Sequence, residues 1–198
     1  MTKYILVGGA DRASPNYLHD LKAEIAKTIH GPLRVLSCFF AEPREVWEEK
    51  FKVRIAWFRS GLGDKTHLDL AFPDSFEQQV QASDVIYLHG GDDVLLAHYL
   101  DNIPDLAKLW DGKVIVGSSA GANYLARYYW TCDWRQARQG RGLTDLNVIP
   151  HFESLQYGKL DPRGPIDWAA ARHELQTLVE PGGHVTPLRE GQFVAVEQ

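Results

Sequence analysis

Short apolar runs that alternate with helical segments constrain the fold of this chain more than any other feature. Four runs are typical of buried strands, at residues 4–7, 33–39, 85–88 and 113–116. Segments with apolar residues at helical spacing lie between them, such as residues 43–60. Strands that alternate with helices favour a parallel sheet covered by helices on both faces. We therefore expect an α/β chain that folds as a three-layer sandwich with a mostly parallel sheet.

Weaker patterns complete the expected order of elements. The first helix is expected to begin at Ser14 and Pro15, because serine caps helices and proline suits the first helical position. Further strands are expected at 66–70, 146–149, 185–188 and 192–196, and further helices at 75–82, 94–100, 104–110, 120–129 and 167–178. A loop is expected at 153–165, which is rich in glycine and proline. No repeat or linker interrupts this order, so residues 1–198 are expected to form a single domain.

Composition excludes several classes of function. The net charge of −5 gives no global positive field for nucleic acid. The two cysteines, Cys38 and Cys132, are too few for a disulfide scaffold and fit a reducing compartment. The apolar run near the N-terminus is too short for a signal sequence or a membrane span. We expect a cytoplasmic protein with no nucleic-acid or membrane partner.

The most informative segment is the turn that follows the run at 113–116. It contains G-x-S-x-G from Gly117 to Gly121, between an expected strand and an expected helix. Glycines permit the sharp turn that projects the Ser119 hydroxyl from the carboxyl edge of a sheet. The backbone N–H of Ala120 then points toward an oxyanion that forms on a substrate carbonyl. A phosphate loop or a simple helix cap uses similar residues, but the strand–turn–helix context favours a nucleophile.

Two other segments supply the partners that a serine nucleophile needs. A glycine turn at 89–91 ends the run at 85–88, and turns at the carboxyl ends of neighbouring parallel strands lie side by side. The Gly91 N–H is therefore expected to be the second oxyanion donor. His151 follows an apolar run and Pro150, and imidazole is the usual base for a serine nucleophile. Of the eight histidines, His151 is the best placed for this role.

Together these segments resemble peptidase family S51, the family of aspartyl dipeptidase (peptidase E) and cyanophycinase. The family's glycine turn, its G-x-S-A-G-A-N nucleophile turn and its N-P-H-F segment have counterparts at 89–93, 117–123 and 149–152. The resemblance implies a class I glutamine amidotransferase-like fold, which has a flavodoxin-like architecture. It also implies a single catalytic domain over residues 1–198 that hydrolyses short peptides, such as Asp-Xaa dipeptides.

The resemblance further assigns roles to single residues. It implies Ser119 as nucleophile, His151 as general base and acid, and Gly91 with Ala120 as oxyanion donors. The reaction would pass through an acyl-enzyme. Neither a metal nor an organic cofactor is implied. A short peptide is the expected partner, and the chain is expected to be a monomer or a homodimer.

A carboxylate is expected to orient His151, and three candidates remain open. Asp133 lies near the position at which aspartyl dipeptidases carry an aspartate. Glu153 gives the His-x-Glu spacing of the amidotransferases, and Glu190 lies in an Arg-Glu-Gly turn that is similar to the family's. We favour Asp133 as the third member of the triad.

Substrate-binding residues are expected near the nucleophile: Gly90, Asp92, Asn123 and Arg163. An arginine such as Arg163 can bind a substrate carboxylate through two hydrogen bonds. The glycine turn departs from the family's G-G-G-N-T, because it begins at His89 and ends in Asp92 and Asp93. Two carboxylates repel an acidic substrate unless a cation compensates, which leaves the aspartate specificity open.

Two other functions fit the same segments. An esterase of the α/β-hydrolase type shares G-x-S-x-G, but its histidine normally lies nearer the end of a longer chain. A catalytically idle domain would bind a small ligand in the same cleft, since a fold does not determine a function. Reaction with a serine-directed phosphonate separates the two hydrolases from the ligand-binding domain.

Overall fold

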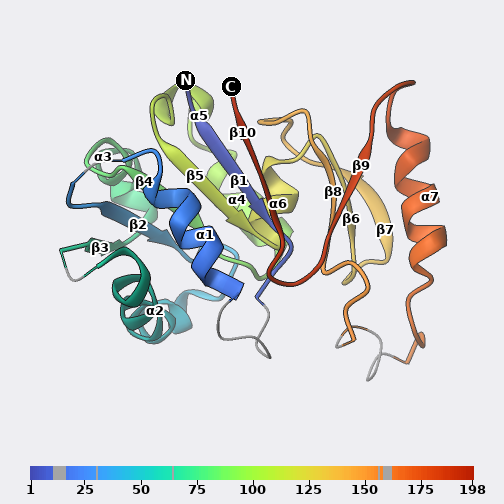
Figure 1. Ribbon diagram of the computed structural model, residues 1–198, viewed down its shortest axis with the longest axis horizontal. Coiled ribbons are helices and arrows are strands. Elements are labelled where there is room, and N and C mark those ends of the chain that lie inside the picture. Colours follow the sequence, from blue (N-terminus) through green and yellow to red (C-terminus); the bar gives the residue numbers. More distant parts are fainter. Residues whose placement is uncertain (11–16, 30, 64, 156, 158–161) are drawn as a thin grey trace.

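Two β-sheets form the framework of the computed structural model, which describes residues 1–10, 17–29, 31–63, 65–155, 157 and 162–198 (Figure 1). The strands are β1 (Lys3–Val7), β2 (Arg34–Cys38), β3 (His67–Leu70), β4 (Val85–Leu88), β5 (Val114–Ser118), β6 (Tyr128–Thr131), β7 (Gln136–Gln139), β8 (Asn147–Pro150), β9 (Val185–Leu188) and β10 (Phe193–Glu197). The α-helices are α1 (Tyr17–Ala26), α2 (Trp47–Leu62), α3 (Phe76–Gln81), α4 (Asp93–Leu100), α5 (Leu106–Leu109), α6 (Ala120–Leu125) and α7 (Trp168–Leu178). Short 3-10 helices at Arg44–Val46 and Pro73–Ser75 precede α2 and α3.

The larger sheet has six strands in the order β10-β1-β5-β4-β2-β3. Strand β10 is antiparallel to β1, and the other neighbouring pairs are parallel. Alternate side chains of β1 enter different cores: Ile5 packs with residues of α1 and α2, whereas Leu6 packs with residues of α3 to α6. Helices therefore cover both faces, and the expected three-layer α/β fold with a mostly parallel sheet is confirmed.

A second sheet of four strands, in the order β7-β6-β8-β9, was not expected from the sequence. The expected helix at 120–129 is wrong in its second half, because α6 ends at Leu125 and Ala126 has an extended backbone with ψ of 159°. The chain then enters β6, whose aromatic and β-branched residues suit a strand between two neighbours. Helix α7 packs on this sheet through Ala171 and Leu175.

The remaining elements follow the expected order, with shifted bounds. The helix expected at 104–110 is reduced to the single turn Leu106–Leu109. The expected start of the first helix at Ser14 and Pro15 lies outside the described residues, and the described helix runs from Tyr17 to Ala26. Assignment of residues 1–198 to a single domain stays a prediction.

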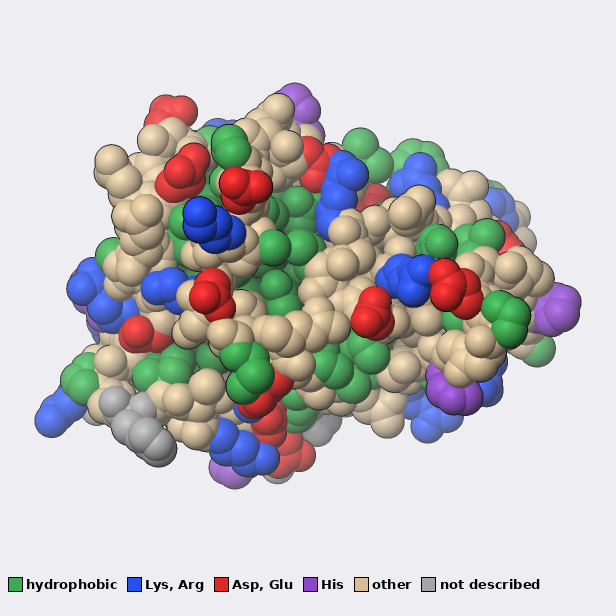
Figure 2. Space-filling view, turned by 90° about the horizontal axis from the view of Figure 1, so that it is seen from above, with side chains coloured by type: hydrophobic (Ala, Val, Ile, Leu, Met, Phe, Trp, Pro, Cys, Tyr) green, Lys and Arg blue, Asp and Glu red, His purple; other side chains and the backbone are tan. Residues whose placement is uncertain are grey.

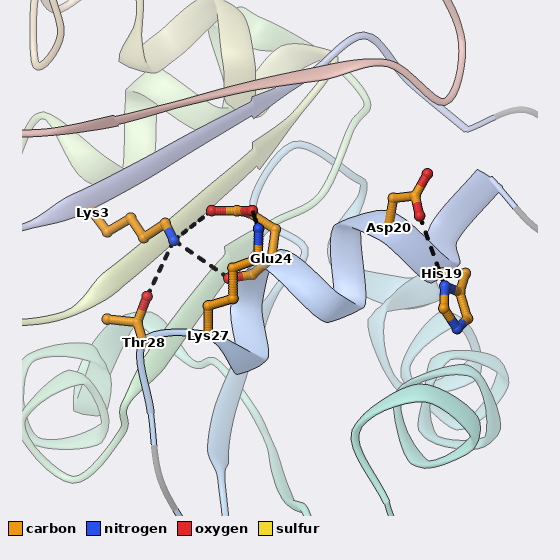
Figure 3. A network of polar contacts seen from close by, with 6 residues as sticks. All are labelled: Lys3, His19, Asp20, Glu24, Lys27 and Thr28. Carbon is orange, nitrogen blue, oxygen red and sulfur yellow. Dashed lines mark hydrogen bonds and ion pairs between the residues drawn. The ribbon is translucent and has the colours of Figure 1, made fainter.

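A polar network joins β1 to α1 on one side of the larger sheet (Figure 3). Lys3 Nζ lies 2.6 Å from Glu24 Oε1, and these side chains are only 9% and 17% exposed. Lys3 also contacts the Thr28 hydroxyl at 3.2 Å, and Lys27 binds the same glutamate at 2.7 Å. Hydrogen bonds from Lys27 and Lys3 hold the pKa of Glu24 below its usual value. The network therefore keeps the charge of the nearly buried lysine compensated.

Both chain termini lie at the same end of the molecule (Figure 1). Figure 2 looks onto this end, and basic and acidic side chains are interspersed over it. The visible part of this face therefore shows no broad basic surface of the kind that binds nucleic acid. Within the described part of the chain, no helix combines the length and apolar character needed to cross a membrane.

Candidate active site

Ser119 occupies the turn between β5 and α6 in a strained backbone conformation. Its φ of 52° and ψ of −108° fall in a region that residues other than glycine rarely adopt. The flanking glycines allow close packing around it. A Cβ on Gly117 would lie 2.5 Å from the Gly121 carbonyl oxygen, and one on Gly121 would lie 2.6 Å from the Leu88 carbonyl oxygen. The G-x-S-x-G segment therefore forms the tight strand-to-helix turn that the sequence predicts.

A chain of hydrogen bonds runs from Ser119 through His151 to Glu190. Ser119 Oγ lies 2.9 Å from His151 Nε2, and His151 Nδ1 lies 3.1 Å from Glu190 Oε1. The histidine and glutamate side chains are 15% and 17% exposed. A proton on Nδ1 is consistent with this arrangement, since Nδ1 then donates to the carboxylate and Nε2 accepts from the hydroxyl. The geometry is that of a nucleophile, a base and an orienting carboxylate.

The surroundings of Glu190 favour its ionised form. Partial burial raises the pKa of this carboxyl group, but hydrogen bonds with His151 and Ser154 outweigh it and hold the pKa below the usual value. A carboxylate that remains charged at neutral pH stabilises an imidazolium on His151.

Glu190, rather than the favoured Asp133, is thus the carboxylate at His151 Nδ1. Asp133 lies in the turn after β6, where Arg163 Nη2 donates to its backbone carbonyl at 3.0 Å. Glu153 forms an ion pair with Arg189. The expectation that Asp133 orients His151 is therefore corrected to Glu190.

The pairing of β8 with β9 explains this correction. The two strands are parallel, with Pro150 opposite Leu188. Residues that directly follow the two strands are therefore neighbours, which brings His151 to the turn that contains Glu190. The Arg-Glu-Gly turn was visible in the sequence, but the pairing of these two strands was not.

The end of β1 connects the nucleophile to the base. Three successive carbonyl groups, those of Val7, Gly8 and Gly9, accept hydrogen bonds from the N–H groups of Ser119 (3.0 Å), His151 (2.7 Å) and Gly191 (2.9 Å), respectively. Gly9 has φ of 119°, and a Cβ at this position would lie 2.1 Å from His151 Cε1. The sequence analysis predicts a strand at 4–7 and assigns no role to Gly8 or Gly9, which follow it.

The expected oxyanion donors lie beside the nucleophile. A Cβ on Gly90 would lie 3.1 Å from Ser119 Cβ, so the glycine turn packs directly against the serine. Gly91 has φ of 147°, and a Cβ there would lie 2.1 Å from the Ala41 carbonyl oxygen. Neither the Gly91 N–H nor the Ala120 N–H donates to another described residue. Both groups are thus available to an oxyanion.

Two cavities adjoin Ser119, with volumes of about 550 and 370 Å³. Both are lined by Gly91, Ser119 and Tyr157. The larger extends to α2 and to the wall formed by Phe39, Tyr87 and His89, and the smaller extends to Trp134 and to three carboxylates, Asp92, Asp93 and Asp133. Volumes of this size suit small ligands.

The three carboxylates have different partners. Asp92 caps α4, accepting the N–H groups of Val94 and Leu95 at 2.8 and 3.1 Å. Asp93 accepts a hydrogen bond from the Tyr129 hydroxyl at 2.8 Å and forms an ion pair with Arg138 at 3.8 Å. Partial burial, together with the charges of Asp93 and Asp92, raises the pKa of Asp133. The smaller cavity therefore has an acidic lining.

The other expected substrate-binding residues are dispersed. Gly90 lines the larger cavity and Asp92 the smaller. Asn123 is buried in α6, where its N–H donates to the Ser119 carbonyl oxygen, and Arg163 is held at the Asp133 carbonyl. Neither Asn123 nor Arg163 lines either of these two cavities.

Tyr157 was missed by the sequence analysis. Its ring lies 4.8 Å from that of His151 and lines both cavities. It belongs to a segment expected only as a loop, and no local pattern signalled its position.

Among the described residues, no group of three or more His, Cys, Asp or Glu side chains is arranged to hold a metal ion.

Comparisons with known proteins identify the family and the fold of this chain. Residues 5–198 match the model of peptidase family S51. A peptidase from an acI-B1 Actinobacterium has a similar structure, with a TM-score of 0.68 and 22% sequence identity over 99% of this chain and 83% of the other. A Listeria monocytogenes EGD-e protein, described as a peptidase E candidate, matches with a TM-score of 0.62 and 14% identity over 99% of this chain and 94% of the other.

No curated protein sequence matches the chain significantly. The structural matches confirm the class I glutamine amidotransferase-like fold. The family match extends over nearly all of the chain and includes the three segments at 89–93, 117–123 and 149–152. The chain therefore belongs to peptidase family S51.

Proposed function

We propose that this chain is a serine peptidase that hydrolyses short peptides through an acyl-enzyme. The observation that carries the proposal is the hydrogen-bond chain from Ser119 through His151 to Glu190. Membership of family S51 supports a peptidase over an esterase. Cavities of about 550 and 370 Å³ that adjoin the serine fit short substrates.

The mechanism follows from the positions of these groups. Ser119 Oγ attacks the peptide carbonyl while its proton passes to His151 Nε2. The Gly91 and Ala120 N–H groups bind the oxyanion, and the Glu190 carboxylate stabilises the imidazolium. His151 then donates its proton to the leaving amine, which departs and leaves an ester on Ser119. Water, deprotonated by His151, hydrolyses this ester and restores the free serine.

Family resemblance and local charge predict different preferences for the first residue of the substrate. The resemblance implies Asp-Xaa dipeptides, whereas Asp92, Asp93 and Asp133 line the smaller cavity. Like charges at short range disfavour an ionised aspartate there. A dipeptide panel with acidic, neutral and basic first residues distinguishes a preference for aspartate from a preference against it.

The test compares the wild type with Ser119→Ala on this panel, and with Ser118→Ala as a matched control. Loss of the nucleophile is expected to lower kcat by about 10⁴-fold or more, as in other serine hydrolases. The Ser118 variant keeps its activity, and a serine-directed phosphonate labels Ser119 in both proteins that retain it. Peptide hydrolysis that survives in Ser119→Ala would refute the proposal. Absence of both turnover and labelling in the wild type would instead favour a ligand-binding domain.

A further inference from the structure

The two cavities differ in which catalytic group they adjoin, and this difference gives the substrate a direction. Ser119 lines both, whereas His151 lines only the larger of the two. The histidine that takes the proton of the nucleophile later donates it to the leaving amine. The leaving amine therefore lies beside His151. On the basis of the proposed function, the larger cavity holds the leaving-group residue and the smaller one holds the acyl residue.

Two cations of α2 line the larger cavity, Lys50 and Arg54, which are one helical turn apart. Two glutamates also line it. Glu42 forms an ion pair with Lys50, and Glu49 is exposed. Arg54 is partly buried and forms no ion pair with a carboxylate among the described residues. Glu42 therefore neutralises the charge of Lys50 but not that of Arg54.

The part of the cavity wall that Phe39, Tyr87 and His89 form carries no charge. His89 is 4% exposed, its Nε2 lies 2.7 Å from Ser37 Oγ, and its ring stacks on Phe39 at 4.0 Å. Burial, with smaller contributions from the charges of Arg54 and Lys50, keeps the pKa of His89 well below its usual value. A neutral imidazole and an aromatic ring thus line the same cavity as the guanidinium, and neither competes with it for an anion.

We propose that Arg54 binds the C-terminal carboxylate of the leaving-group residue and thereby selects substrates that end one residue after the cleaved bond. A planar guanidinium matches the two oxygens of a carboxylate and can donate two parallel hydrogen bonds to it. A cavity of about 550 Å³ between His151 and α2 accommodates one amino-acid residue with this carboxylate at its far end. A longer peptide or a C-terminal amide presents a neutral group to Arg54 instead.

The test uses two matched substrate pairs: Asp-Leu with its C-terminal amide, and Lys-Leu with its C-terminal amide. The wild type is expected to prefer each free dipeptide over its amide by about 10- to 100-fold in kcat/KM, the range for a hydrogen bond between charged groups. Arg54→Met is expected to lose this preference, mainly through a higher KM for the free dipeptides, so that each free dipeptide and its amide have similar values of kcat/KM. Arg54→Lys restores part of the preference. Arg59→Met, a substitution of an exposed arginine on the same helix, has no effect.

Calorimetry in the Ser119→Ala background separates this proposal from the proposed function, because binding there requires no turnover. Stronger binding of the free dipeptide than of its amide, abolished by Arg54→Met, supports the role of Arg54 even if the wild type hydrolyses neither substrate. Equal affinity of the dipeptide and its amide overturns that role, even if the wild type hydrolyses both. The role of Arg54 is also overturned if Arg54→Met lowers kcat/KM by the same factor for the free dipeptide and for its amide.

Discussion

The two sheets contribute different halves of the candidate site. The larger sheet supplies the nucleophile and the expected oxyanion donors, at the ends of β4 and β5. The smaller sheet supplies His151 and Glu190, which follow β8 and β9 and lie 39 positions apart in the chain. Ser119 and Ala120 lie in one short turn that adjacent residues encode, whereas His151 and Glu190 come together only when two distant segments pair. This difference separates what is encoded locally from what requires tertiary structure.

The largest effect expected from breaking the base half is that of Glu190→Gln. The neutral amide cannot stabilise the imidazolium, so kcat is expected to fall by about 10³- to 10⁴-fold. The matched variant Asp133→Asn removes the carboxylate favoured by the sequence analysis and is expected to change kcat by less than about tenfold, since Asp133 is not the carboxylate at Nδ1. Steady-state kinetics on the best dipeptide of the panel measures both. A larger loss in Asp133→Asn would reverse the assignment of the orienting carboxylate.

A smaller effect is expected where the two halves meet. Gly9→Ala would place a Cβ 2.1 Å from His151 Cε1 and displace the imidazole from Ser119. Misplacement of a catalytic group by about 1 Å costs on the order of 10²-fold, and we expect this loss in kcat with little change in KM.

Gly31→Ala is the control for the strained backbone of Gly9→Ala. Gly31 has a similar φ of 115°, but a Cβ there meets no atom within 4 Å. The activity of the Gly31→Ala variant per folded molecule is therefore expected to match that of the wild type. Equal losses in the two variants would show that backbone strain, and not contact with His151, causes the effect.

The smallest effect on activity is expected at the network between Lys3 and Glu24, on the side of the larger sheet away from the base half. Glu24→Gln leaves the nearly buried Lys3 ammonium without its carboxylate, and the free energy of unfolding is expected to fall by about 1–3 kcal/mol while kcat is unchanged. Urea unfolding at neutral and acidic pH measures the difference. Glu48→Gln, at an exposed ion pair with Arg44, serves as the control and should leave the stability unchanged.

The pH dependence of that difference has a definite sign. The pKa of Glu24 is lowered in the folded chain by Lys27 and Lys3. Its contribution is therefore complete above the ordinary glutamate pKa of 4.5 and is lost as the pH falls through the lowered value. The wild type and Glu24→Gln should converge in stability at acidic pH. A difference that grows on acidification would contradict this account.

The comparison of the two halves also explains how much the sequence could predict. The larger sheet was predictable because buried parallel strands are short apolar runs and the turn around Ser119 is encoded by adjacent residues. The first two residues of β6, Tyr128 and Tyr129, were mistaken for helix because they continue an apolar pattern, and the pairing of β6 with β7 and β8 depends on distant residues. Tertiary context decides such cases.

The site divides in the same way. The sequence predicted the approach of Ser119 and His151 from motif order, and the structure places their side chains 2.9 Å apart. It did not predict Glu190 at Nδ1, because that contact requires β8 beside β9. Nor did it predict Tyr157 near the histidine or the contact of Gly9 with the imidazole, which have no signature in neighbouring residues. The catalytic roles, the cytoplasmic location and the oligomeric state stay predictions.

The three carbonyl groups at the end of β1 have a consequence for local unfolding. They hold the amides of Ser119, His151 and Gly191, so a single opening of this segment exposes all three to solvent. Local openings of this kind occur as cooperative units and are reported by hydrogen exchange. The three amides should therefore exchange at one common free energy of opening. That free energy would give the fraction of molecules in which the nucleophile and the base are held together by these hydrogen bonds. It would do so independently of the stability of the rest of the fold.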